Sequence, residues 1–229
     1  MFSVITSAMV ATPASVSGAY VGTSGFSYPS WRGGFYPEKA RPSEFLGWFS
    51  ERLPSVELNT TFYQLPAEEQ LRRWAAQTPP DFRFGVKMSR RITHGGRFEL
   101  LPTFTEQVRA LGEKLGPILV QFPPTRPRDE GLLRLVLDSL DPELEYAFEF
   151  RHESWAGADV PVHVNSLDGD APFRYFRLRE PPYDDETLRA WAARFRPLLE
   201  DGTRIYCYFK HEDEPSAPLY AQRLLELLR

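Results

Sequence analysis

A regular alternation of short apolar runs and longer amphipathic segments is the feature that most constrains the fold of this chain. Runs rich in Val, Ile, Phe and Tyr recur at 19–22, 55–59, 82–87, 117–122, 145–150, 174–179 and 204–209. Segments with helical periodicity lie between or after them, at 42–53, 67–77, 103–115, 129–140, 183–200 and 217–229. Strands and helices that alternate in this way form a parallel sheet whose strands are joined by crossover helices.

Seven such repeats with a helix at the C-terminus predict an α/β fold, a TIM-type (β/α)8 barrel. The 229 residues suit one domain of this kind, whose usual size is ~250 residues. A doubly wound open sheet is the alternative, and it requires a glycine-rich phosphate-binding turn after the first strand. The stretch "GTSGFSYPSW" (22–31) does not have that glycine spacing. The barrel is therefore favoured.

One region departs from the regular pattern. Residues 151–173 are too few to hold a helix, a sixth strand and another helix. The stretch "PVHVNSL" (161–167) is interpreted as that sixth strand, with Pro161 at the first position, where proline is tolerated. We expect a barrel that is degenerate around strand six and lacks the helix after strand five.

The chain is expected to form a single barrel domain over 20–229, preceded by a loose N-terminal extension at 1–19. The extension is rich in Ser, Ala and Thr, and no positive charge precedes Arg32, whereas an export signal begins with basic residues. No stretch approaches the ~20 apolar residues of a membrane span. The single cysteine, Cys207, lies in an apolar run and is interpreted as a core thiol. A cytoplasmic location and no membrane partner are expected.

Polar residues occupy the last positions of nearly every predicted strand, although strands covered on both faces are normally apolar. Glu57 and Asn59 share one face of their strand, as do Glu149 and Arg151. The other strand ends carry Lys87, Gln121, Arg177, Arg179, Lys210 and His211. Barrel active sites form at the carboxyl ends of the strands, so these residues predict a polar, partly basic pocket there. The alternative is a salt-bridge network that only fills the barrel mouth, made of Glu57, Glu149, Lys87, Arg151 and Arg177.

Two loops add candidate binding residues. The stretch "GFSYPSWRGGFYP" (25–37) carries Tyr28 and Trp31, which are candidates for stacking on a ligand, unless so long a loop uses its aromatic residues as a small core of its own. The stretch "VKMSRRITHGGR" (86–97) clusters basic side chains and suits an anion or phosphate, unless it is a solvated basic loop. Its basic residues are Lys87, Arg90, Arg91, His94 and Arg97.

A metal site is a further possibility that the sequence does not resolve. Carboxylate and imidazole side chains suit zinc or manganese if they converge at one barrel mouth. The residues concerned are Glu57, Glu149, His94, His152 and His211. Because the sequence has no H-x-H or H-E-x-x-H pair, we identify no cofactor and no metal ligand, and a divalent metal stays an open alternative.

Several stretches, in this order, resemble the domain of unknown function 72 family of YecE-like proteins. They are "GTSGFSYPSWRGGFYP", "VELNTTFYQLP", "RWAAQTPPDFRFGVKMSRRITH", "LGPILVQFPP", "EFRHESW", "YFRLR" and the later "LRAWA". The resemblance implies a TIM-type barrel from about residue 20 to the C-terminus, but no established reaction. The family's signature positions map to Gly22, Gly25, Tyr28, Trp31, Tyr36, Glu57, Asn59, Thr61, Phe62, Tyr63, Lys87, Arg90, Thr93, His94, Gln121, Glu149, Arg151 and Trp155.

The chain departs from the family pattern in its C-terminal half. The strand that usually continues as Arg-Leu-His-Gly reads Arg177-Leu178-Arg179-Glu180, and the last strand, which usually ends in "FNN", reads Phe209-Lys210-His211. The helix after "RHESW" is also missing. This half of the site is therefore expected to differ from that of its relatives.

These observations predict that the barrel binds a small anionic ligand such as a phosphorylated sugar or a nucleotide, as a hydrolase or isomerase. Glu57 and Glu149 are the candidate catalytic acid and base, because two carboxylates in one basic pocket can have divergent pKa values. The candidate ligand-binding residues are Asn59, Tyr63, Lys87, Arg90, His94, Gln121, Arg151, Arg177, Tyr28 and Trp31. The alternatives are a nucleic-acid-binding protein that uses the basic 87–97 loop, although the net charge of −4 argues against a broad footprint, and a non-catalytic degenerate barrel.

Overall fold

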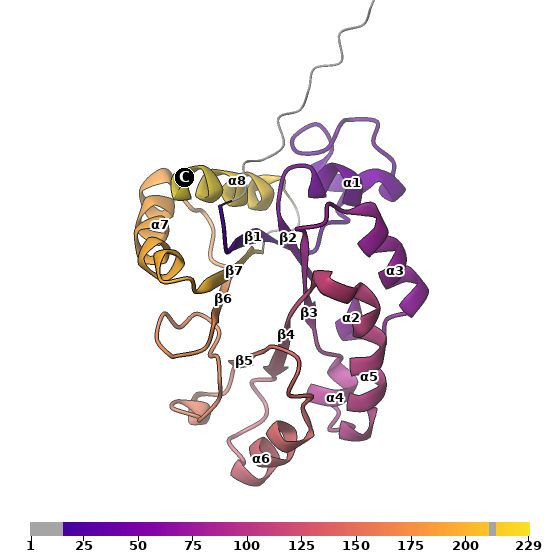
Figure 1. The fold of residues 1–229 in the computed structure, drawn as a ribbon, viewed down its shortest axis with the longest axis vertical. Helices are drawn as coiled ribbons and strands as arrows, with labels where there is room; N and C mark the ends of the chain where they lie inside the picture. Colours follow the sequence, from indigo (N-terminus) through magenta and orange to yellow (C-terminus); the bar gives the residue numbers. More distant parts are fainter. Residues whose placement is uncertain (1–15, 211–213) are drawn as a thin grey trace, which may run out of the picture.

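Seven parallel strands stand around a common centre, and helices cover their outer side (Figure 1). The structure, a computed structural model, describes residues 16–210 and 214–229. The strands are β1 (Ala19–Ser24), β2 (Ser55–Leu58), β3 (Arg83–Lys87), β4 (Leu115–Phe122), β5 (Tyr146–Phe150), β6 (Phe173–Leu178) and β7 (Arg204–Phe209). They pair in the order β5-β4-β3-β2-β1-β7-β6, and every ladder is parallel. The predicted barrel is confirmed.

The helices follow the strands in the predicted alternation. They are α1 (Phe45–Ser50), α2 (Thr60–Tyr63), α3 (Glu68–Gln77), α4 (Arg90–Thr93), α5 (Leu101–Val108), α6 (Glu130–Ser139), α7 (Asp185–Glu200) and α8 (Ser216–Leu228). Short 3-10 turns are present at η1 (Pro29–Trp31), η2 (Pro42–Glu44), η3 (Phe98–Leu100), η4 (Arg109–Lys114) and η5 (Glu153–Trp155). Asp129 caps α6 and Asp184 caps α7 by accepting a backbone hydrogen bond three residues on. The single-turn helices α2 and α4 were not predicted, and each lies just past a strand end.

The barrel wall has a seam between β5 and β6, which form the two edges of the sheet. Residues 161–165 bridge it: the backbone N–H of Phe148 donates to Val162 O (2.8 Å), and the N–H of Asn165 donates to Tyr175 O (2.9 Å). The predicted sixth strand at 161–167 is thus reduced to an isolated bridge at His163. Residues 151–172 contain the η5 turn and no α-helix, so the expected missing helix is confirmed.

One buried arginine holds the loop that leads from this bridge into β6. The guanidinium of Arg174 donates to the backbone oxygens of Leu167 (3.0 Å), Ala171 (2.7 Å) and Gly169. These bonds satisfy a charged group that is otherwise costly to bury. The loop therefore has a fixed place although it lacks regular structure.

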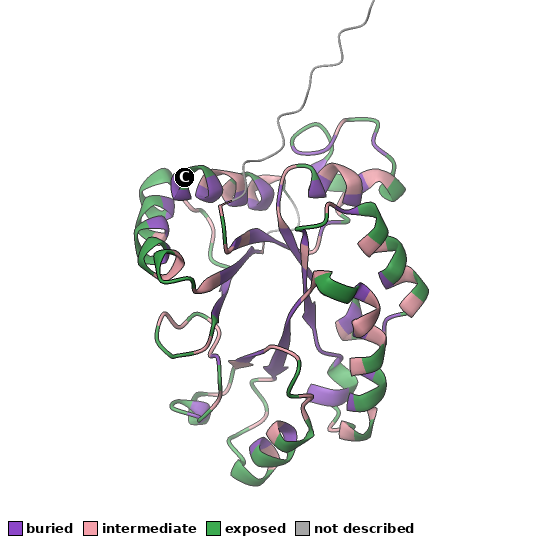
Figure 2. Ribbon diagram, in the orientation of Figure 1, coloured by how far each residue is buried: buried purple, intermediate pink, exposed green. Residues whose placement is uncertain are grey.

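Apolar side chains fill two regions, one between the strands and the helices and one inside the barrel. Figure 2 shows buried strands surrounded by helices that are exposed on their outer faces. The interior is rich in tyrosine, and its buried members are Leu119, Ala147, Val162, Phe173, Tyr175, Tyr206 and Tyr208. Tyr208 fits because β3 has a glycine beside it: a Cβ at Gly85 would lie 2.7 Å from the Tyr208 hydroxyl oxygen. The barrel below its mouth is thus filled, and polar side chains lie on top of this filling.

Two further sequence predictions concern the chain as a whole. Cys207 is buried in the core as expected, and burial raises the pKa of its thiol. Among residues 16–210 and 214–229, no helix has the length and hydropathy needed to cross a membrane. Most of the predicted N-terminal extension, residues 1–15, lies outside the described residues.

Candidate functional site

Glu57, the last-but-one residue of β2, is the most deeply buried charge at the carboxyl end of the barrel. Its exposed fraction is 0%. Three polar groups surround its carboxylate. Ser24 Oγ donates to Oε2 (2.5 Å) and Tyr175 Oη donates to Oε1 (2.8 Å), while Arg177 Nη2 donates to Oε2 and Nε lies 2.9 Å from Oε1. The charge that interrupts this apolar strand is therefore compensated by side chains of β1 and β6.

Arg177 on β6 joins the two candidate catalytic carboxylates. Its Nη1 donates to Glu149 Oε2 on β5 (2.5 Å), so one buried guanidinium bridges Glu57 and Glu149. Arg151 Nε donates to the other oxygen of Glu149 (2.9 Å), and Arg179 Nη1 lies 3.4 Å from it. The sequence prediction that these residues meet at one end of the barrel is correct, and much of the suggested salt-bridge network is present.

Both carboxylates are held in the ionised form. Burial alone would raise the pKa of Glu57, but the charge of Arg177 and the hydrogen bonds from Ser24 and Tyr175 outweigh it and leave the pKa below its usual value. The pKa of Glu149 is likewise lowered, because Arg177 and Arg151 outweigh the effect of burial. Both pKa values are shifted in the same direction, so the surroundings of the two glutamates do not mark one as the acid and the other as the base.

Lys87, the last residue of β3, is buried but does not join the network. Among residues 16–210 and 214–229, no carboxylate lies within 4 Å of its ammonium group. Its Nζ instead lies 3.9 Å from the centre of the Phe62 ring. Burial, and next the charge of Arg177, lower the pKa of Lys87 from 10.5 to about 8. This lysine exchanges a proton much closer to neutral pH than an ordinary lysine does.

Two amide side chains complete the inner part of the site. Gln121 on β4 is paired in register with Glu149 and is 3% exposed, and its Oε1 has no hydrogen-bond partner among the described residues. Asn59 Nδ2 donates to Ser24 Oγ (2.8 Å) and so fixes the hydroxyl that contacts Glu57. Buried polar atoms nearly always have a hydrogen-bond partner, so the Gln121 oxygen is suited to accept a hydrogen bond from a ligand or a water molecule.

The predicted basic loop forms the outer part of the site next to Lys87. His94 packs edge-on against Phe62 (5.0 Å between ring centres), and burial, followed by the charge of Lys87, lowers its pKa. Arg90 is exposed, and its guanidinium carbon lies 5.6 Å from the centre of the Tyr63 ring. Tyr63 is 64% exposed, which is unusual for an aromatic side chain, so this part of the rim offers a cation and a free ring together.

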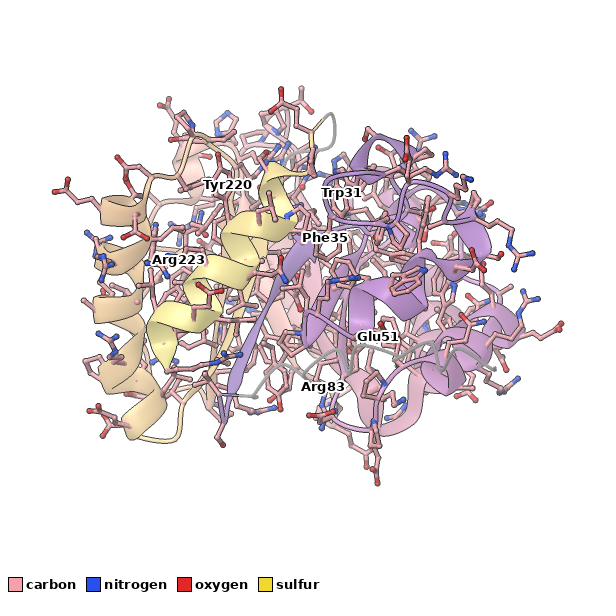
Figure 3. The ribbon with its side chains drawn as sticks, turned by 90° about the horizontal axis from the view of Figure 1, so that it is seen from above. Trp31, Phe35, Glu51, Arg83, Tyr220 and Arg223 are labelled. Atoms are coloured by element: carbon pink, nitrogen blue, oxygen red, sulfur yellow. The ribbon has the colours of Figure 1, made fainter. Side chains whose placement is uncertain are left out.

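The aromatic loop after β1 has mainly a core of its own. Trp31 is 0% exposed and contacts Phe35 and Tyr36, with ring centres 6.0 and 5.9 Å apart. In Figure 3 Trp31 and Phe35 lie at one end of the barrel and Arg83, where β3 begins, lies at the other. Tyr28 is half-buried, packs against Trp31 with the two rings tilted by 47°, and donates to Ser24 O (2.9 Å). The sequence left two interpretations of this loop, stacking on a ligand and a small core of its own. For Trp31 the structure favours the small core, because a fully buried ring offers no face to a ligand.

Two hollows open beside Glu149, one at the loop that replaces the missing helix and one toward α7. One, of about 510 Å³, is lined by Glu149, Arg151, His152, Trp155, Asn165 and Arg179 among others. The other, of about 580 Å³, shares Glu149, Asn165, Arg177 and Arg179 and extends to Tyr183 and Trp191. Both volumes lie within the range of small-molecule sites.

The candidate metal ligands do not assemble within the described part of the chain. Residues 16–210 and 214–229 contain no group of three or more His, Cys, Asp or Glu side chains placed to hold a metal ion. His94 Nδ1 lies 2.9 Å from Thr93 Oγ1, and His152 Nδ1 accepts from the backbone N–H of Ser154 (3.2 Å). His211 lies outside the described residues.

Two residues of the inner site were not found from the sequence. Ser24 lies beyond the predicted end of the first strand, which in fact continues to this residue. The sequence around Tyr175 indicates an ordinary aromatic residue of the core. Tyr175 nevertheless precedes Arg177 by two positions and therefore lies on the same face of β6. That spacing is the signal that could have identified it.

Comparison with known protein families places most of the chain in one family model. The model, described as "Protein of unknown function DUF72", matches residues 20–167 and 158–229. The two matched stretches overlap at 158–167, a range that includes the segment that bridges the seam. The match therefore covers the barrel.

Curated relatives and solved structures agree with this match. The chain is 34% identical over 139 residues to the UPF0759 protein YecE of Escherichia coli (58% of this chain, 48% of that protein), and 28% identical over 149 residues to the UPF0759 protein YunF of Bacillus subtilis (59% and 51%). It thus spans about half the length of these curated relatives. A DUF72 family protein from Enterococcus faecalis superposes with a TM-score of 0.73 at 18% identity (92% of this chain, 97% of that chain), and one from Thermotoga maritima with 0.70 at 28% identity (92% and 98%).

Proposed function

The chain belongs to the DUF72 family, and we propose that its barrel binds a small anionic organic molecule at the carboxyl end of the strands. The observation that carries the proposal is the excess of positive charge there. Glu57 and Glu149 are compensated by Arg177 and Arg151, while Lys87 and Arg179 add cationic groups to the same site. A phosphate or carboxylate group would offset this excess. A cytoplasmic location is part of the proposal, supported by the free thiol of Cys207.

Lys87 is a better candidate for proton transfer than the two glutamates. A group that acts as acid or base works best when its pKa lies near the operating pH. The pKa of Lys87 is about 8, whereas Glu57 and Glu149 are held as carboxylates by their arginine partners. In a hydrolase or isomerase of this architecture, the glutamates would hold Arg177 in place and Lys87 would exchange the proton.

A thermal-shift comparison tests the anion site. Ribose 5-phosphate at ten times its Kd is expected to stabilise the protein by about 1.4 kcal/mol through mass action, which corresponds to a rise in Tm of about 3 to 6 °C. Ribose at the same concentration is expected to have no effect, because it lacks the charged group. The combined variant Arg151→Gln and Arg179→Gln is expected to lose the shift.

Arg72→Gln is the matched control for this experiment. It removes a cation from the exposed Arg72–Glu68 pair on α3, away from the barrel mouth, and should keep the full shift. An equal shift with ribose and ribose 5-phosphate, or an unchanged shift in the Arg151 and Arg179 variant, would contradict the proposal.

Nucleic-acid binding through the 87–97 loop is a second candidate, and the pairing of Tyr63 with Arg90 favours it. An exposed ring with a cation beside it is a stacking platform for a base, and Arg91 is also exposed. The net charge of −4 limits such binding to a local patch.

Fluorescence anisotropy with a short single-stranded oligonucleotide tests this second candidate. The affinity is expected to fall as salt rises, because the released counterions carry the binding energy. The combined variant Arg90→Ala and Arg91→Ala is expected to weaken binding at least tenfold, and Tyr63→Ala to weaken it by ~1–3 kcal/mol through lost stacking. Affinity that is indifferent to salt or to these changes would exclude the loop as a nucleic-acid site.

A further inference from the structure

Lys87 is the one lysine of this barrel mouth, among the described residues, whose surroundings suit covalent chemistry. We propose that its amine forms an imine with the carbonyl carbon of an anionic aldehyde or ketone bound at the site. The inference rests on the proposed function for the anionic group, and it adds the chemical class of the substrate and the bond that is made.

Burial of Lys87 without a carboxylate partner favours a neutral, nucleophilic amine. Lys87 is 8% exposed and, among the described residues, no carboxylate lies within 4 Å of its Nζ, while the contact of Nζ with the Phe62 ring favours the charged form and offsets part of this effect. Thr61 Oγ1 donates to the backbone oxygen of Lys87 (2.6 Å), which fixes the end of β3 from which the side chain extends. A lysine activated for attack on a carbonyl is typically desolvated in an apolar pocket or placed next to another cation. Lys87 is desolvated by burial and has Arg177 and Arg151 as cationic neighbours, whose effect on its pKa is opposed by Glu57 and Glu149.

The surrounding charges suit the product of the reaction. An imine of lysine is protonated and therefore carries the charge of the original ammonium group. Glu57 and Glu149 are ionised and exert a favourable electrostatic effect on Lys87 in its charged form. The substrate's phosphate or carboxylate group would meet Arg151 and Arg179, the two arginines beside Oε1 of Glu149. The site thus has separate partners for the iminium and for the anionic group of the substrate.

The step balances without an oxidant or reductant. The lone pair of the neutral Nζ attacks the carbonyl carbon, and the carbonyl oxygen gains a proton, which gives a carbinolamine. The C–O bond then breaks and the oxygen leaves as water. Taken from the ammonium form, two protons of Lys87 leave with the carbonyl oxygen, and one C=N bond replaces one C=O bond. The iminium can then stabilise a carbanion at the adjacent carbon, as isomerisation or carbon–carbon cleavage requires.

Reductive trapping with site-resolved mass spectrometry tests the proposal on the 229-residue chain. The protein is incubated with pyruvate and sodium cyanoborohydride, and the adduct is located among the four lysines of the sequence, Lys39, Lys87, Lys114 and Lys210. At pH 7.5 the free-amine fraction of a lysine of pKa about 8 exceeds that of an ordinary lysine by on the order of 100-fold. We therefore expect Lys87 to be modified on the order of 100-fold faster than the exposed Lys39, and a Lys39→Arg variant to react at the wild-type rate.

Acetone and ribose 5-phosphate separate the two proposals. A larger Lys87-to-Lys39 labelling ratio with pyruvate than with acetone supports both the imine and the anion site. An equal ratio with the two ketones, still well above one, supports the imine and removes the requirement for an anionic group. If ribose 5-phosphate stabilises the protein but Lys87 is labelled no faster than Lys39, the imine is overturned while the anion site stands. Because the comparison is made within the wild-type protein, it does not depend on the folding of a Lys87 variant.

Discussion

Replacing Arg177 with methionine is expected to lower the free energy of unfolding by about 3 to 5 kcal/mol. Methionine has a similar length but no charge, so Glu57 would stay buried at 0% exposure without its cation, and Glu149 would lose its closest partner. The loss comes mainly from an uncompensated buried carboxylate, not from the attraction itself. Urea denaturation followed by circular dichroism measures it.

A double-mutant cycle identifies the cause of that loss. Glu57→Gln combined with Arg177→Met is expected to be less destabilised than the sum of the two single variants, because the amide needs no counter-charge. The control Arg72→Met disrupts an exposed pair on α3 and should change stability by no more than about 0.5 kcal/mol. A loss below about 1 kcal/mol for Arg177→Met would show that Glu57 does not depend on this arginine.

Gly22→Ala is expected to destabilise the protein by about 3 kcal/mol or more, because no space exists for a side chain at this position. Gly22 is paired in register with Ser55, and a Cβ there would lie 1.7 Å from the backbone oxygen of Ser55. The clash is with backbone, so it can be relieved only if β1 and β2 move apart. Since Ser24 and Glu57 lie farther along the same two strands, the site would be distorted as well.

Gly47→Ala is the matched control for this substitution. A Cβ at Gly47 would meet nothing within 4 Å, and the residue lies inside α1, where alanine is more favourable than glycine by about 0.5–1 kcal/mol. Thermal or urea unfolding is expected to show a small stabilisation for Gly47→Ala. A Gly22→Ala protein as stable as the wild type would disprove the close approach of β1 and β2.

The strands were predictable because each is an apolar run with a distinct end. Observed and predicted bounds differ by two residues at most, as in β4, which begins at Leu115 instead of 117. The single-turn helices α2 and α4 were not predictable, since four residues cannot show a helical period. The missing helix was anticipated from chain length alone, but the seam was not, because the sixth strand expected at 161–167 forms only a bridge at His163.

The site was predictable in its location but not in its pairing. Period-two alternation places Glu57, Glu149 and Arg177 inward at strand ends, and the parallel topology brings these ends together. Arg177 lies between both glutamates while Lys87 has no carboxylate partner. This arrangement depends on the positions of strands whose paired residues are 28 and 120 residues apart in sequence. The sequence therefore predicted proton transfer by the carboxylates of Glu57 and Glu149, whereas the arrangement of charges supports our proposal that the amine of Lys87 transfers the proton.

The seam between β5 and β6 gives the barrel a diameter that is not fixed by a complete ring of ladders. In a closed cylinder each strand is held by two neighbours, but β5 and β6 each have one full ladder, and residues 161–165 span the gap with a few hydrogen bonds. The circumference of the barrel can therefore increase on this side if those few hydrogen bonds break, without the loss of a complete ladder. Glu149 and Arg177 lie on the two sides of the seam, so any such expansion would change the separation of the charges that hold the mouth together.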